Sequence, residues 1–236
     1  MEEMLSQVLS AGLQEIGIDT AFTEKLLAYG EAVLKANQSF NLLGNVEPRE
    51  FVVKHILDSL AGIAAIDSAK TVLDMGTGAG LPGFPLAICL PDVQFALVDA
   101  TEKKVHFLSE TAEMLGVQNL RAIAGRAEEL GRGTMREHFD LCVSRAMAPM
   151  EKLSEYCLPL VKVGGRLVAY KGPKAKEELE AAKMAVQALG GGESSVRAVN
   201  VPFLEGERNL IVIAKTRQTP GKYPRTNAQI KNKPIR

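Results

Sequence analysis

The feature that most constrains this chain is a short, mainly apolar stretch that runs directly into a glycine-rich loop. The stretch covers residues 71–75, and Gly76, Gly78 and Gly80 follow it at alternate positions. Glycine reaches positive φ angles at little steric cost and lets a ligand approach the backbone. A helix that begins just after such a loop points its first amide groups at the ligand. We therefore predict a strand, loop and helix with a ligand site at the carboxyl end of the strand.

An alternation of strand and helix continues along the chain from residue 71. Strands are predicted at 71–75, 93–98, 120–124, 139–143, 165–170, 194–201 and 208–215. Helices are predicted at 82–90, 102–116, 149–157 and 174–189. This order predicts a doubly wound α/β sheet. No convincing helix separates the last two strands, so we expect them to form an antiparallel hairpin at one edge.

The segments before and after this α/β domain differ from it in pattern. Residues 1–66 carry apolar side chains at helical spacing, with Thr20 as a possible helix cap and Pro48 at the start of a third helix. We expect an N-terminal helical extension over 1–66, the α/β domain over 67–216 and a basic tail over 217–236.

The tail has six basic side chains and no acidic one, although the formal net charge of the whole chain is zero. Residues 1–216 therefore carry a formal charge of −6. Pro220, Pro224 and Pro234 are expected to prevent a regular helix in the tail. Two interpretations stay open: a solvated, partly disordered terminus, or an arm that lies on nucleic-acid phosphates.

Cysteine and histidine content argues against a disulfide framework and a metal site. Cys89, Cys142 and Cys157 form no C-x-x-C pair, and the three histidines are dispersed. An odd, scattered set of cysteines is typical of a reducing compartment. The N-terminus lacks the features of a signal peptide, and the glycine-rich region is no membrane span. We expect a soluble cytoplasmic monomer without a metal.

Asp74 bears on the choice of ligand, because a carboxylate beside the loop would repel a pyrophosphate. No lysine follows Gly83, which excludes a phosphate P-loop, and the match of Gly78, Gly80 and Gly83 to a dinucleotide fingerprint is weak. S-adenosylmethionine has no phosphate and carries an ammonium and a sulfonium, so an acidic rim suits it. Alternatively, Asp74 caps the following turn by accepting hydrogen bonds from local amides.

Two further positions indicate a nucleoside. Asp99 ends the second predicted strand, where an acidic side chain can accept both ribose hydroxyls; alternatively it caps the helix near Glu102. Ala127 and Glu128 follow the third strand and can contact the adenine amino group, unless Glu128 belongs to a solvated surface. Asp99 alone does not distinguish adenosylmethionine from NAD.

An ordered set of segments spans nearly the whole chain and resembles the RsmG (GidB) family of class I, Rossmann-like methyltransferases. The matching segments are residues 41–42, 55–60, 73–83, 103–108, 144–146, 171–172 and 223–225. The resemblance implies transfer of a methyl group from S-adenosylmethionine to guanine N7 in 16S ribosomal RNA of the small subunit. One departure is Lys104, where many members have arginine.

The resemblance also implies that five residues contact the cofactor: Gly76, Leu81, Ala127, Glu128 and Arg145. Arg145 would pair with the methionine carboxylate of the cofactor or with an RNA phosphate. Together with the residues argued above, the predicted cofactor set is Asp74, Gly76, Gly78, Gly80, Leu81, Asp99, Ala127, Glu128 and Arg145.

The acceptor is expected to need no general base, because guanine N7 has a free lone pair and no proton to lose. We therefore assign no catalytic residue.

His55 and Asp58 share a helix face and form part of an acceptor pocket or, alternatively, a helix–domain contact. Basic residues expected to bind RNA phosphates are Lys103, Lys104, Arg126, Lys171, Arg208, Lys222 and Arg225. Another RNA, protein or small-molecule acceptor, a dinucleotide-dependent oxidoreductase and a non-catalytic RNA-binding protein stay open as alternatives.

Overall fold

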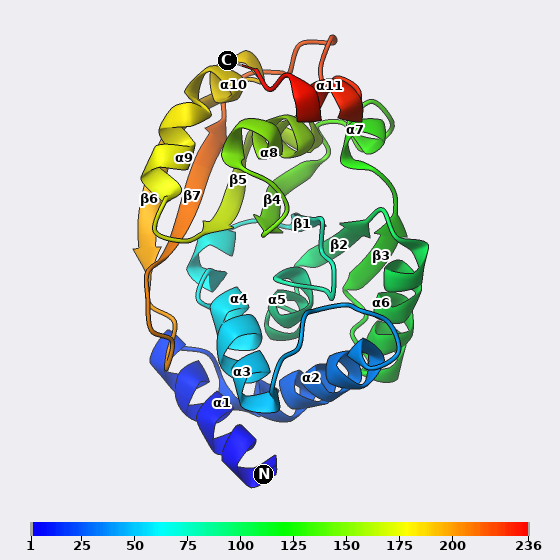
Figure 1. The fold of residues 1–236 in the computed structure, drawn as a ribbon, viewed down its shortest axis with the longest axis vertical. Helices are drawn as coiled ribbons and strands as arrows, with labels where there is room; N and C mark the ends of the chain where they lie inside the picture. The colour runs from blue at the N-terminus through cyan, green and yellow to red at the C-terminus, as the bar shows by residue number, and fades with distance from the viewer. Residues whose placement is uncertain (1, 236) are drawn as a thin grey trace.

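The fold is built on one seven-stranded sheet with strand order β3-β2-β1-β4-β5-β7-β6 (Figure 1). The structure is a computed structural model that describes residues 2–235. Its strands are β1 (Thr71–Met75), β2 (Gln94–Asp99), β3 (Leu120–Ala124), β4 (Phe139–Arg145), β5 (Val161–Lys171), β6 (Gly191–Val199) and β7 (Arg208–Lys215). Strands β1 to β5 pair in parallel, and β7 pairs antiparallel with both β5 and β6. The predicted doubly wound sheet and its antiparallel edge hairpin are confirmed.

Helices cover both faces of the sheet. They are α5 (Gly83–Cys89), α6 (Glu102–Met114), α7 (Ala127–Leu130), α8 (Met150–Cys157), α9 (Ala175–Ala181) and α10 (Lys183–Ala188). Side chains of a strand alternate between the two faces, so Val72 belongs to the hydrophobic cluster that contains α5 and α6, whereas Leu73 belongs to the cluster that contains α8 and α10. The sheet thus separates two cores.

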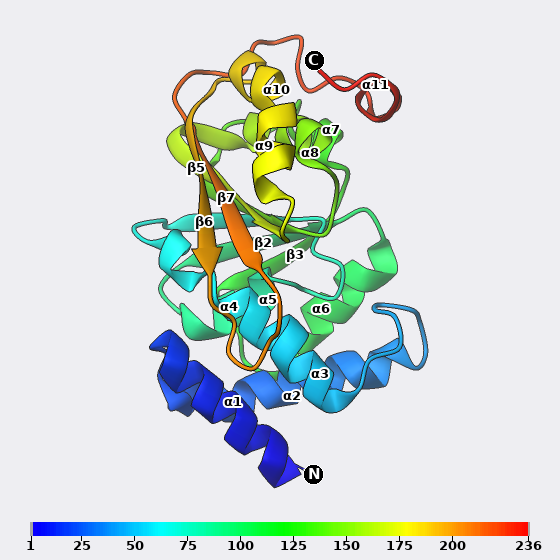
Figure 2. The same cartoon turned by 60° about the vertical axis from the view of Figure 1, so that its left-hand side comes forward.

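The first 66 residues continue one of these cores. Helices α1 (Glu2–Ile16) and α2 (Thr23–Asn37) lie below the sheet, with a helical run from α3 (Pro48–Phe51) through the π-helical residues 52–57 to α4 (Asp58–Leu60) (Figure 2). Tyr29 of α2 stacks on Phe84 of α5 with ring centroids 4.5 Å apart. Its hydroxyl donates to the carbonyl of Ala79 in the glycine loop at 2.9 Å. The helical extension therefore supports the loop directly.

Several local predictions differ from the structure. The cap near residue 20 is Asp19, whose side chain accepts a hydrogen bond from Ala21 N, and not Thr20. The helix predicted over 174–189 is two helices that meet at Ala182. Strand β5 begins four residues early, at Val161, because Val161 already pairs with Phe139 of β4, ahead of an irregularity in the register. The four-residue helix α7 is too short to leave a periodic pattern in the sequence.

The tail is packed against the domain, which contradicts its interpretation as a disordered terminus. Residues 227–232 form the helix α11 (Asn227–Asn232), with a capping box between Thr226 and Gln229. The prediction that prolines prevent a helix is wrong because α11 fits between Pro224 and Pro234. Within residues 2–235, no helix has the length and apolar character needed to cross a membrane.

We predict that Tyr29→Phe lowers the free energy of unfolding by about 1–2 kcal/mol, because it leaves the buried carbonyl of Ala79 without its donor. Urea denaturation monitored by circular dichroism measures the change. Tyr223→Phe, which removes a hydroxyl from a partly exposed ring, is the matched control. Equal stability of Tyr29→Phe and the wild type would contradict the role given to this hydrogen bond.

Candidate cofactor and acceptor site

The glycine loop leaves β1 in the conformation that its sequence predicts. The φ angles of Gly76, Gly78 and Gly80 are 74°, 59° and 103°. A Cβ atom at Gly76 would lie 2.9 Å from Cγ of Met147, on the loop after β4. The amides of Gly76 and Thr77 both donate to the carbonyl of Val98. The loop is therefore fixed against the end of β2, and residue 76 has no room for a side chain.

Asp74 lies beneath this loop, which corrects the prediction that its carboxylate faces a cationic ligand. The side chain is fully buried and does not line a cavity. Its Oδ2 accepts hydrogen bonds from Oγ1 of Thr77 at 2.6 Å and from the amide of Gly83 at 2.8 Å. Burial raises the pKa of Asp74 to about 6. The structure supports the alternative interpretation, in which Asp74 stabilises the turn.

Two adjoining cavities open at the carboxyl ends of the parallel strands. The larger has a volume of about 910 Å³ and the smaller about 510 Å³. Residues that line both are Gly76, Asp99, Met147, Ala148 and Pro149. The glycine loop and the loop after β4 therefore form the boundary between the two cavities, and the predicted ligand site at the carboxyl end of β1 corresponds to this boundary.

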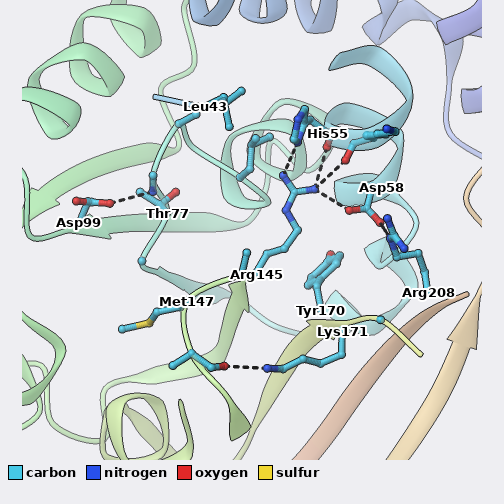
Figure 3. Close-up of a pocket in the computed structure, with 18 of the residues that line it drawn as sticks. Leu43, His55, Asp58, Thr77, Asp99, Arg145, Met147, Tyr170, Lys171 and Arg208 are labelled. Carbon is cyan, nitrogen blue, oxygen red and sulfur yellow. Dashed lines mark hydrogen bonds and ion pairs between the residues drawn. The ribbon is translucent and has the colours of Figure 1, made fainter. Parts of the chain in front are cut away.

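Asp99 is held at this boundary by the glycine loop itself. Its Oδ2 accepts a hydrogen bond from the amide of Gly78 at 3.1 Å (Figure 3). Its Oδ1 accepts one from Thr101 N at 2.9 Å. Nζ of Lys104 lies 3.7 Å from Oδ2. The N-cap of α6 is Thr101, so the prediction that Asp99 caps this helix is wrong; Asp99 accepts a hydrogen bond from the amide of Thr101 and lines both cavities.

The smaller cavity contains the predicted nucleoside contacts beyond Asp99. Ala127 and Glu128 line it, and both are buried, with Glu128 only 8% exposed. The neighbouring Glu129 is exposed. The carboxylate of Glu128 therefore belongs to the cavity wall and not to a solvated surface.

The larger cavity contains a charged cluster that joins three segments of the chain. Nη1 of Arg145, at the end of β4, lies 2.8 Å from Oδ2 of Asp58, and Nε of Arg208 lies 3.2 Å from Oδ1 of the same carboxylate (Figure 3). Nη2 of Arg145 lies 3.3 Å from Nδ1 of His55. Burial, and then the charge of Arg145, lowers the pKa of His55 to about 4. His55 is therefore neutral near pH 7, and Asp58 connects the N-terminal helices to the sheet.

A second ion pair fixes the loop after β4. Nζ of Lys171 donates to the carbonyl of Ala148 at 2.8 Å and to Oε2 of Glu178 at 2.7 Å. The same carboxylate oxygen accepts a hydrogen bond from the amide of Met150. Lys171 and Glu178 therefore hold the segment that separates the two cavities.

Comparison with known proteins identifies the family. Residues 22–211 match the family model described as GidB, rRNA small subunit methyltransferase G. This chain belongs to that family. It is 41% identical to the ribosomal RNA small subunit methyltransferase G of Alkaliphilus metalliredigens, over 97% of this chain and 98% of that protein. It is also 41% identical to the protein of the same name from Deinococcus deserti, over 100% of this chain and 98% of that protein.

Solved structures of methyltransferases share the fold of this GidB-family chain. The O-methyltransferase from Bacillus cereus in complex with SAH has a TM-score of 0.55 and 16% identity, over 79% of this chain and 90% of that one. A predicted O-methyltransferase, Atu636 from Agrobacterium tumefaciens, has a TM-score of 0.55 and 18% identity, over 70% of this chain and 82% of that one. The class I methyltransferase fold expected from the sequence is confirmed.

The basic residues outside the tail that are predicted to bind RNA lie in three different environments of this GidB-family structure. Lys104, Lys171 and Arg208 line the larger cavity, and Arg126 lines the smaller. Nζ of Lys103 lies 4.5 Å from the centroid of the Phe40 ring, at a groove between α2 and α6.

The two predicted RNA contacts in the tail line neither cavity. Lys222 lies over the ring of Tyr223, with Nζ 5.2 Å from its centroid. Arg225 pairs with the fully buried Glu155, with Nη2 2.7 Å from Oε2. The position of Arg225 indicates a structural role, which corrects its prediction as a free phosphate contact.

Sequence reasoning missed several residues that line the cavities. Leu43, Lys54 and Tyr170 line the larger one, and Lys152, Tyr156 and Asn227 line the smaller one. None belongs to a recognisable motif, and each reaches its cavity through the fold. Cys142 and Cys157 are free cysteines that lie fully buried in the core.

We predict that Asp74 makes the stability of the fold depend on pH. Its pKa of about 6 in the fold lies above the ordinary value of 3.8, so ionisation favours the unfolded chain. Its contribution is most favourable below pH 4 and is lost as the pH rises through about 6, by on the order of 2–3 kcal/mol.

The free energy of unfolding, measured for the wild type and Asp74→Asn between pH 4 and pH 8, isolates this effect. The difference, wild type minus variant, is expected to fall as the pH rises. Asp92→Asn, at an exposed aspartate, is the control. A difference that does not change with pH would contradict the prediction.

Proposed function

We propose that this chain transfers a methyl group from S-adenosylmethionine to guanine N7 in 16S rRNA of the small ribosomal subunit. The proposal rests on family membership and on relatives named ribosomal RNA small subunit methyltransferase G. The observation that carries it is the pair of adjoining cavities at the glycine loop, one for the cofactor's nucleoside and one for the acceptor base.

The residues present fit the cofactor. Gly76 lines both cavities, and its lack of a side chain keeps its backbone open to a ligand there. Asp99 can accept hydrogen bonds from ribose hydroxyls, and Ala127 and Glu128 can contact the adenine. The guanidinium of Arg145 can pair with the methionine carboxylate from the larger cavity. When bound, the cofactor supplies a methyl group already activated on a sulfonium.

The chain's own contribution is then orientation and exclusion of water. The larger cavity has room for a guanine base beside the cofactor's methionine end. N7 loses no proton during transfer, so no residue has to accept one. His55, the imidazole in this cavity, is neutral near pH 7, and its Nδ1 lies 3.3 Å from Nη2 of Arg145. The charged cluster around Asp58 and Arg145 therefore determines the shape and the electrostatic potential of the larger cavity and takes no part in proton transfer.

RNA phosphates are proposed to bind to the basic side chains around the two cavities. Lys104, Arg126 and Arg208 line them directly, while Lys103 and Lys222 lie further out. Lys171 instead acts through the loop after β4, which it holds.

We further propose that residues 1–66, 67–216 and 217–236 act as one unit, and that the chain acts as a monomer in the cytoplasm.

Incubation of the purified protein with methyl-labelled adenosylmethionine tests the acceptor. Naked 16S rRNA, 30S subunits and 70S ribosomes are supplied in parallel, and the labelled nucleotide is mapped by mass spectrometry. We expect label on a guanine as 7-methylguanine. Label on another atom, on protein alone or on no ribosomal component would overturn the proposed acceptor.

We predict that Gly76→Ala raises the Kd for adenosylhomocysteine at least tenfold, because the new Cβ meets Met147 and the backbone there has a φ of 74°. Isothermal titration calorimetry measures the Kd. Gly44→Ala is the control, since no atom lies within 4 Å of its added Cβ. If both variants bind like the wild type, the cofactor does not lie against residue 76.

A further inference from the structure

The C-terminal tail forms part of the wall of the smaller cavity. Helix α11 lies beside α7 and α8 in both views (Figures 1 and 2). Two of its residues, Asn227 and Lys231, line the smaller cavity together with Glu128 and Tyr156. The cavity proposed to hold the cofactor's nucleoside is therefore bounded in part by residues that follow Glu128 by about 100 positions in the sequence.

Buried contacts hold the tail in this position. The carboxylate of Glu155, on α8, accepts hydrogen bonds from the backbone amide and the guanidinium of Arg225 at 2.7–3.2 Å. Arg132 donates to the carbonyl of Pro224, and Ile230 of α11 is fully buried. A buried carboxylate that lost its partner would be costly. These contacts make the tail a fixed wall in the described structure.

Asn227 lines the smaller cavity with one end of its side-chain amide already engaged. The hydroxyl of Tyr156 donates to its Oδ1 at 2.7 Å. Because Oδ1 is thereby engaged, the Nδ2 group is the end of the amide that can donate into the cavity. The carboxylate of Glu128 lines the same cavity and can only accept when ionised.

A donor and an acceptor in one cavity match the chemistry of adenine. Adenine presents an exocyclic amino group, which donates, and ring nitrogens, which accept. Glu128 can accept from the amino group, and Asn227 can donate to a ring nitrogen. A nucleoside site with both groups favours adenine over a base that carries a carbonyl in place of the amino group.

We propose that Asn227, oriented by Tyr156, is a cofactor-binding residue that recognises the adenine ring from the C-terminal tail. This inference rests on the proposed use of S-adenosylmethionine and adds the tail to the cofactor site. The tail thus contacts the cofactor directly, in addition to any contact that its exposed lysines make with RNA.

Calorimetric titration of the full-length protein with adenosylhomocysteine tests the assignment. Asn227→Ala is expected to raise the Kd about tenfold, and Tyr156→Phe, which frees the amide to turn, about threefold. Asn232→Ala is the matched control, since Asn232 is an exposed asparagine on the same helix that does not line the cavity. It is expected to bind like the wild type.

Titration with methylthioadenosine, which lacks the amino-acid part of the cofactor, localises the effect. Asn227→Ala should weaken its binding by the same factor as that of adenosylhomocysteine. A loss with adenosylhomocysteine alone, or an equal loss in Asn232→Ala, would overturn the assignment.

The inference and the proposed function fail in different ways. If the wild type binds both ligands and Asn227→Ala binds them equally well, only the role of Asn227 is overturned. If the wild type binds neither ligand, the proposed cofactor is overturned, and the inference with it. Thermal midpoints of all four proteins, expected to agree closely, show that the variants are folded.

Discussion

The site depends on one buried carboxylate that fixes the glycine loop. Oδ2 of Asp74 accepts hydrogen bonds from Thr77 at the start of the loop and from Gly83 at the start of α5. Its Oδ1 has no hydrogen-bond partner among residues 2–235, and the side chain is fully buried. Burial of a carboxylate opposes folding unless hydrogen bonds compensate. The loop therefore keeps one conformation, because any other conformation would break both hydrogen bonds to the Asp74 carboxylate, which is buried where water does not reach it.

Other parts of the chain then approach this fixed loop from both sides. Tyr29 of α2 donates to Ala79 within it, and Arg145 of β4 reaches across to Asp58 of the N-terminal helices. The helical extension therefore has two roles at the site: it supports the glycine loop from beneath, and it forms part of the wall of the larger cavity. The loop after β4 completes the arrangement, because Lys171 and Glu178 hold it where it separates the two cavities.

The sequence predicts those parts of this arrangement that depend on local chemistry. Strand positions follow from apolar stretches, and the positive φ angles of Gly76, Gly78 and Gly80 follow from the absence of a side chain. The role of Asp74 was not predictable, because a carboxylate two residues before a glycine can lie above or beneath the loop with the same sequence. The packing of the tail was not predictable either, because the partner of Arg225 is 70 residues away.

The charge of the tail illustrates how composition can mislead. Six basic side chains after residue 216 suggest an arm for phosphates, yet Arg225 neutralises a buried glutamate and Arg217 donates to the carbonyl of Gln187. A guanidinium committed to a buried carboxylate contributes little long-range field, because the opposite charges lie within 3 Å of each other. If RNA phosphates bind to cations at the cavities, such as Lys104 and Arg126, as proposed, the charge of Arg225 adds little to their attraction. Salt dependence of RNA binding would accordingly respond to those side chains more than to Arg225.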